Sequence, residues 1–97
     1  MGKVHLDHNP LAEMDRLVGL AKRGQKKAFD AGVSPSISRA LWSLLSDQIH
    51  GAGLSVRGDE NGDTFGLQDK FGKENLRGNV KFEKRSGKWT AVRLTTK

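Results

Sequence analysis

The residues of this 97-residue chain best suited to chemistry are basic, and they are concentrated toward its C-terminal end. Residues 69–97 carry nine basic side chains against three acidic ones, a net charge of +6 that equals the formal charge of the whole chain. Clustered lysine and arginine side chains attract polyanions, because neutralising phosphates releases their condensed counterions. With a pI near 10.0, the sequence favours nucleic acid as a partner.

Five of these cations surround two aromatic residues, Phe82 and Trp89. They are Lys81, Lys84, Arg85, Lys88 and Arg93. Such cations can hold a phosphate backbone while a ring stacks on a base. The alternative is that both rings belong to the core of a small sheet. We take Lys84, Arg85, Lys88 and Arg93 as candidate nucleic-acid-binding residues.

The second candidate site is the stretch AFDAGVSPSISRAL, residues 28–41. Gly32 would permit a left-handed turn, Val33 could fill the space between two helices, and the next helix would present small polar and basic groups. This stretch resembles the helix-turn-helix of DNA-binding regulators of the lac-repressor type, in which A-G-V-S precedes T-V-S-R-A-L. Here residues 31–34 and 37–41 carry that pattern, with one residue fewer between them. The same residues would also build an ordinary corner between two packing helices.

The resemblance implies that the helix after Gly32 contacts DNA, and it favours DNA over RNA. Arg39 is its best candidate, because five donors suit a guanine edge or a phosphate. Residues of the preceding helix would contact phosphates without specifying sequence. The candidate residues of this unit are Lys26, Lys27, Ser36, Ser38, Arg39 and Ser43.

Other motifs point away from catalysis and from bound metal. Residues 5–8, HLDH, could supply metal ligands, but a stable site usually needs a further ligand from elsewhere. Residues 58–63, GDENGD, lack the glycine and the final acid of a calcium loop and are predicted to be a turn. The chain has no cysteine and no nucleophile elbow. We therefore expect no enzymatic activity, no cofactor and no metal.

The elements that position these residues follow from apolar periodicity. Asn9 and Pro10 are suited to begin a helix whose apolar stripe continues to Gly24. A short helix is predicted over residues 25–31, and a third from residue 34 to residue 49, closed by glycines.

The second half of the chain has the alternation of β-strands. Short strands are predicted at residues 54–56 and 64–67, and a hairpin at 79–85 and 88–95, with residues 68–78 as a loop. We therefore predict an α+β fold, three helices followed by a small antiparallel sheet. Its element order resembles that of winged-helix proteins.

The chain is short enough to be one domain. Residues 1–8 would be a lead-in, 9–52 the helical half and 53–97 the β half. No segment approaches the roughly 18 apolar residues of a membrane span, and the first residues do not form a signal peptide. We expect a soluble cytoplasmic protein without membrane association.

Three functional hypotheses follow. The first is a small basic DNA-binding regulator of transcription that uses the helix-turn-helix-like unit and the basic hairpin; a homodimer would align two half-sites. The second is a small phage- or plasmid-type effector that binds and inhibits a host nucleic-acid-processing protein. The third is an RNA-binding accessory protein that uses its sheet face.

Overall fold

The computed structural model describes residues 9–47, 54–59, 62–69 and 76–96. The predicted α+β class is confirmed, with the helices preceding the strands. The lead-in at residues 1–8, its HLDH cluster and the end of the third predicted helix lie outside the described residues. The elements are α1 (Pro10–Lys22), α2 (Lys26–Asp30), α3 (Pro35–Asp47), β1 (Leu54–Arg57), β2 (Thr64–Asp69), β3 (Leu76–Arg85) and β4 (Lys88–Thr96).

The predicted start and end of α1 are both confirmed. The Asn9 side-chain oxygen accepts a hydrogen bond from the backbone N–H of Ala12 at 2.7 Å, and Pro10 is the first helical residue. Gly24 follows the helix with a φ of 70°, a conformation that glycine adopts without steric cost. No helix in the described part of the chain has the length and apolar character to cross a membrane.

The four strands form one antiparallel sheet in the order β1-β2-β3-β4. The predicted loop at 68–78 is shorter than expected, because β2 continues to Asp69 and β3 already begins at Leu76. Leu67 pairs with Gly78 and Gln68 with Leu76, which leaves Arg77 as an extra residue in β3. Such an irregularity is a β-bulge, in which one extra residue is left unpaired and the strand pairing is locally disrupted.

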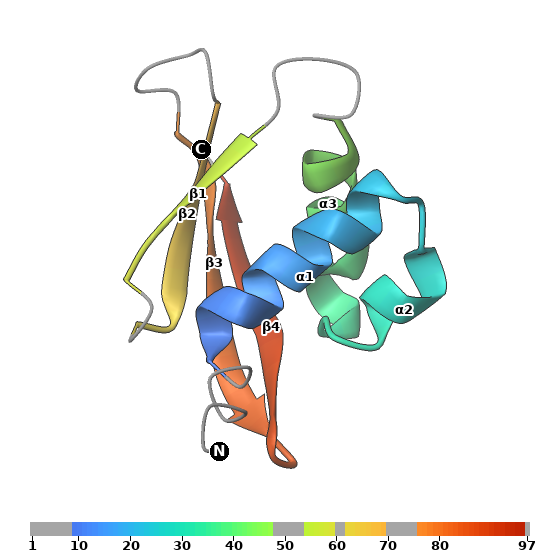
Figure 1. Cartoon of the computed structure of the whole chain (residues 1–97), viewed down its shortest axis with the longest axis vertical. Coiled ribbons are helices and arrows are strands. Elements are labelled where there is room, and N and C mark those ends of the chain that lie inside the picture. Colours follow the sequence, from blue (N-terminus) through green and yellow to red (C-terminus); the bar gives the residue numbers. More distant parts are fainter. Residues whose placement is uncertain (1–8, 48–53, 60–61, 70–75, 97) are drawn as a thin grey trace, which may run out of the picture.

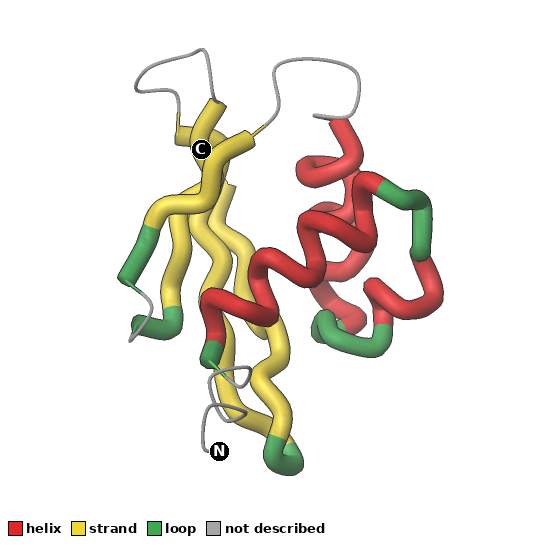
Figure 2. The backbone as a smooth tube through the Cα atoms, viewed as in Figure 1, coloured by secondary structure: helices red, strands yellow, loops and turns green. Residues whose placement is uncertain are grey.

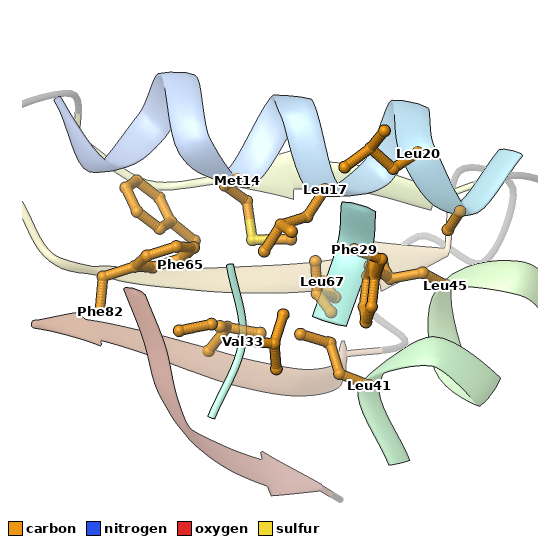
Figure 3. Close-up of a cluster of buried hydrophobic side chains, with 13 residues drawn as sticks. Met14, Leu17, Leu20, Phe29, Val33, Leu41, Leu45, Phe65, Leu67 and Phe82 are labelled. Carbon is orange, nitrogen blue, oxygen red and sulfur yellow. The ribbon is translucent and has the colours of Figure 1, made fainter. Parts of the chain in front are cut away.

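Helices and sheet form two layers, which Figure 1 shows with the sheet on the left and the helices on the right. The same division into a strand layer and a helix layer is clear in Figure 2. Figure 3 shows Met14 and Leu17 pointing from α1 toward the sheet, with Phe65 and Phe82 below the start of the helix. The buried core between the layers consists of Met14, Leu17, Leu20, Ala21, Phe29, Val33, Leu41, Leu45, Phe65, Leu67, Val80, Phe82 and Ala91.

A second bulge, in β4, decides which residues of that strand face the helices. Lys81 pairs with Arg93 and Phe82 with Ala91, so Val92 is the extra residue. Side chains alternate between the two faces of a sheet, and directly paired residues share a face. Ala91 therefore lies on the core side with Phe82, whereas Arg93 lies with Lys81 on the opposite face.

The turn between α2 and α3 is attached to the outer edge of β4. The Ala91 N–H donates to the carbonyl of Gly32 at 3.1 Å, and the Ser34 N–H donates to the carbonyl of Ala91 at 2.8 Å. Val33, between them, is buried with 4% of its surface exposed, as the sequence predicted for a residue that fills the space behind the turn. The turn is therefore held by a strand as well as by its own helices.

The expected left-handed conformation at Gly32 is wrong. Among the described glycines, positive φ angles occur at Gly24 and Gly87. A Cβ at Gly32 would instead lie 3.1 Å from the Arg16 guanidinium and 3.4 Å from a methyl group of Leu17. The space beside Gly32 is therefore limited by side chains of α1, and its backbone is not in the left-handed region.

Candidate nucleic-acid interface

The corner between α2 and α3 is organised around Asp30. The Lys26 ammonium lies 3.0 Å from both carboxylate oxygens of Asp30 and 5.7 Å from the centroid of the Trp42 ring. The Ser38 hydroxyl also donates to Asp30, and Ser38 is 9% exposed. The expectation that Ser38 contacts DNA is therefore corrected: its hydroxyl is buried and already bonded within the corner.

These bonds also perturb the Asp30 carboxyl. The hydrogen bond from Ser38, followed by the hydrogen bond and charge of Lys26, holds the pKa of Asp30 below its ordinary value of 3.8. The carboxylate is therefore ionised near neutral pH, and its charge offsets that of Lys26. Lys26 is less available to a phosphate than its sequence position suggested.

The other predicted residues of the helical half remain exposed. Ser36, Arg39 and Ser43 are spaced three and four positions apart on α3, so they form one solvent-facing stripe, and Lys27 is exposed on α2. Arg39 also borders an open groove at the corner. The residues lining this groove are Lys26, Asp30, Val33, Pro35, Ser38 and Arg39.

The hairpin of β3 and β4 carries its predicted cations on two different faces. Lys84 pairs with Trp89 across the strands, and its ammonium lies 5.8 Å from the centroid of the Trp89 ring. Both residues have the strand parity of Phe82 and therefore lie on the helix side of the sheet. Lys84 is thus separated from its sequence neighbour Arg85.

Three of the predicted cations share a face of the sheet with two further basic residues, on the side turned away from the helices. Register places all five on the face that no helix of the described residues covers, and each is exposed or half-buried. We call this group the basic sheet face: Arg57, Lys81, Arg85, Lys88 and Arg93. Glu83 lies on the same face and forms an ion pair with Arg85 at 3.3 Å, in which both side chains are more than half exposed.

Four of these cations form two directly opposed pairs. Lys81 stands opposite Arg93, and Arg85 stands opposite Lys88. Like charges directly opposite each other in a sheet are destabilising. Within the described residues no acidic side chain forms an ion pair with Lys81, Lys88 or Arg93. The arrangement leaves two concentrations of positive charge that a bound anion would stabilise.

Arg57 is a member of this face that the sequence did not single out. It pairs with Gly66 in β2, and its guanidinium donates to the side-chain oxygen of Gln68 at 3.0 Å. For Lys81 the sequence did contain a signal: it lies between the apolar residues Val80 and Phe82, and this alternation predicts that Lys81 faces away from the core. For Arg57 there was none, since only the pairing of β1 with β2 brings it to this surface.

The sequence-predicted residues therefore occupy separate parts of the surface. Arg39 and its neighbours border the α2–α3 corner, whereas Arg85, Lys88 and Arg93 lie on the sheet face turned away from the helix layer. Within the described ranges, no group of three or more histidine, aspartate or glutamate side chains could hold a metal ion.

The helix-turn-helix resemblance remains a local one, carried by residues 28–41. The turn differs from the expected geometry at Gly32, which does not adopt a positive φ angle. In α2, the helix before the turn, Phe29 is fully buried and Lys27 is exposed. Comparison of the chain with models of known families, with curated proteins and with solved structures gave no match.

Proposed function

We propose that this protein binds nucleic acid and holds its phosphate backbone on the basic sheet face. The observation that carries the proposal is the presence of two pairs of opposed cations, Lys81 with Arg93 and Arg85 with Lys88. Each pair costs the free protein stability through repulsion, and a phosphate between the two side chains would relieve that cost. A polyanion satisfies several such positions at once, which an isolated anion does not.

The chemistry of the side chains supports phosphate as the group bound. Arg57, Arg85 and Arg93 carry planar guanidinium groups, which bind phosphate oxygens through two parallel hydrogen bonds. Lys81 and Lys88 add compact point charges on flexible stems. Among the described residues Glu83 is the one acidic residue that register places with these five cations, so this group of six carries a net charge of +4.

Charge-removal variants test this proposal. Affinity for a DNA oligonucleotide duplex, measured by fluorescence anisotropy over a series of salt concentrations, should fall linearly on logarithmic axes. Replacing Arg85→Gln and Lys88→Gln together should reduce the slope by about 1.8, since each phosphate contact contributes about 0.9. The matched control is Lys22→Gln with Arg23→Gln, which removes the same charge from the exposed end of α1.

The control variant should bind with the slope of the unmodified protein. If no oligonucleotide is retained even at low salt, the proposal fails. In that case, saturable binding of an acidic host protein, lost in the Arg85→Gln/Lys88→Gln variant, would support the effector hypothesis instead.

The exposed stripe on α3 supports a second candidate function, sequence-specific DNA binding by a regulator. Ser36, Arg39 and Ser43 are all accessible, and Arg39 could contact a guanine edge. Because Arg39 lies away from the basic sheet face, we expect Arg39→Ala to leave the salt slope on a random duplex unchanged. Arg93 is an exposed arginine on the basic sheet face, so the matched variant Arg93→Ala should reduce that slope by about 0.9.

Selection of preferred sequences from a randomised duplex library decides whether Arg39 specifies bases. A sequence preference that disappears in Arg39→Ala supports the regulator function. An equal loss of slope in Arg39→Ala and Arg93→Ala would instead make Arg39 a phosphate contact.

A further inference from the structure

The aromatic rings of the described chain all lie away from the basic sheet face. Phe65 and Phe82 meet edge to face between the layers, with their ring centroids 5.8 Å apart. Phe29 and Trp42 meet in the same manner in the helix layer, 5.0 Å apart. Trp89 lies on the helix side of the hairpin, beside Lys84. Among the described residues, the basic sheet face therefore offers cations and no ring.

This distribution distinguishes between two forms of nucleic acid. Proteins that bind single strands without sequence preference combine a basic groove with aromatic side chains on which the bases stack. The basic sheet face supplies the cations, and no aromatic ring of the described residues lies on it. Duplex nucleic acid keeps its bases stacked internally and presents mainly phosphates, which is the ligand that such a face fits.

The spacing of the two cation pairs also favours duplex nucleic acid. Lys81 and Arg85 are four residues apart on β3, which corresponds to about 13 Å at roughly 3.3 Å per residue. The major groove of B-DNA is about 12 Å wide. Each cation pair can therefore meet the phosphates of one strand, with the groove between them. A-form RNA duplexes have a narrow major groove, so the spacing fits DNA better.

Glu83 lies between the two cation pairs, where it faces solvent opposite Thr90. A single strand lying along the hairpin would bring phosphates over this carboxylate, because a phosphate follows every nucleotide of its backbone. A duplex that spans the two pairs with its groove would place no phosphate there. A carboxylate in the middle of a phosphate-binding surface is therefore compatible with duplex and unfavourable for a single strand.

From these observations we infer that the ligand of the basic sheet face is double-stranded DNA, held by phosphates on the two sides of its major groove. The inference rests on the proposed function and narrows its ligand. Lys81 with Arg93 would contact one strand, and Arg85 with Lys88 the other. Arg85 and Lys88 are both exposed, next to the closed end of the hairpin, which extends past the start of α1 (Figure 1).

The experiment measures the affinity of the protein for a DNA duplex of about 20 base pairs, roughly two helical turns, and for each of its separated strands. All measurements use the same salt concentration. We expect the duplex to bind at least about tenfold more tightly than either strand. Glu83→Gln should raise the affinity for the single strands more than that for the duplex. Trp89→Phe should leave duplex affinity within about twofold, because the ring is on the other face.

Opposite results would overturn the inference without touching the proposed function. Single strands that bind as tightly as the duplex, and that lose affinity in Arg85→Gln/Lys88→Gln, would keep the basic sheet face but assign it a single-stranded ligand. A loss of duplex binding in Trp89→Phe would contradict the inference as well. Absence of binding to every probe at low salt is a separate result, which refutes the proposed function. Circular dichroism of each variant establishes that the fold is retained.

Discussion

Asp30 connects the two helices of the corner through bonds that depend on its charge. Ser38 from α3 and Lys26 from α2 both donate to its carboxylate. The helix-turn-helix resemblance placed Ser38 among the groups presented to DNA, because Ser38 matches a position near the start of the recognition helix. The bond to a carboxylate eight positions earlier in the chain could not be inferred from periodicity, since it depends on the angle between α2 and α3.

The first prediction concerns the pH dependence of these bonds. The pKa of Asp30 is lowered in the folded state, first by Ser38 and then by Lys26, so ionisation favours folding. This stability is present above the unfolded pKa of 3.8 and is lost as the pH falls through the folded value. Urea unfolding should find Asp30→Asn less stable than the unmodified protein near neutral pH, and the difference should shrink toward about pH 2. A difference of equal size at both pH values would show that charge is not responsible.

At the scale of elements, the hairpin depends on its two-residue turn. Ser86 and Gly87 both have positive φ angles, 51° and 79°, and Arg85 pairs with Lys88 on either side. This is the pattern of a type I′ turn, whose backbone twist matches that of the flanking strands. The turn therefore fixes the register that sets Arg85 opposite Lys88.

The second prediction tests that turn. Gly87→Ala should destabilise the protein by about 1 kcal/mol, because a side chain with a left-handed backbone meets the following carbonyl. Nothing lies within 4 Å of a Cβ built at Gly87, so backbone strain rather than a clash would cause the loss. Ser86→Asn is the matched change, and it should be neutral or stabilising, since asparagine tolerates this conformation. Equal unfolding midpoints for Gly87→Ala and the unmodified protein would contradict this account.

At the scale of the whole molecule, the proposed binding role of the basic sheet face opposes the stability of the free protein. Its opposed cations are an unfavourable arrangement in the free protein, yet the core beneath them is well packed, with Phe82, Val80 and Ala91 buried on the other side of the same strands. Core burial tolerates the repulsion, which costs only about 0.2–1 kcal/mol per pair. The sheet can therefore carry these opposed cations, as the proposed function requires.

The third prediction is that one substitution moves stability and binding in opposite directions. Arg93→Glu would place an acid opposite Lys81, so the free protein should gain about 0.2–1 kcal/mol at low salt. The gain should diminish as salt screens the exposed pair. Affinity for duplex DNA should fall at the same time. Arg93→Gln, which removes the repulsion without adding attraction, should lie between the two proteins in both measurements. A variant that is both less stable and unchanged in binding would contradict the role of this pair.

Local chemistry alone determined a large part of this protein. Asn9 with Pro10 begins α1, Gly24 ends it, and the Ser86-Gly87 turn closes the hairpin, because caps and turns depend on neighbouring residues. Alternation along β3 also placed Lys81 and Arg85 opposite the core. The excess of basic residues near the C-terminal end needed no structure at all.

Tertiary structure decided where the remaining side chains point. Strict alternation from Ala91 would have turned Arg93 toward the helices and Leu94 toward solvent; the bulge at Val92 reverses both. The limited space beside Gly32 comes from the approach of Arg16 and Leu17 of α1, and Arg57 joins the basic sheet face only through the pairing of β1 with β2. In each case the deciding contact joins residues far apart in the sequence. Periodicity reports which face of its own element a residue occupies, but register and packing between elements determine which surface that face becomes.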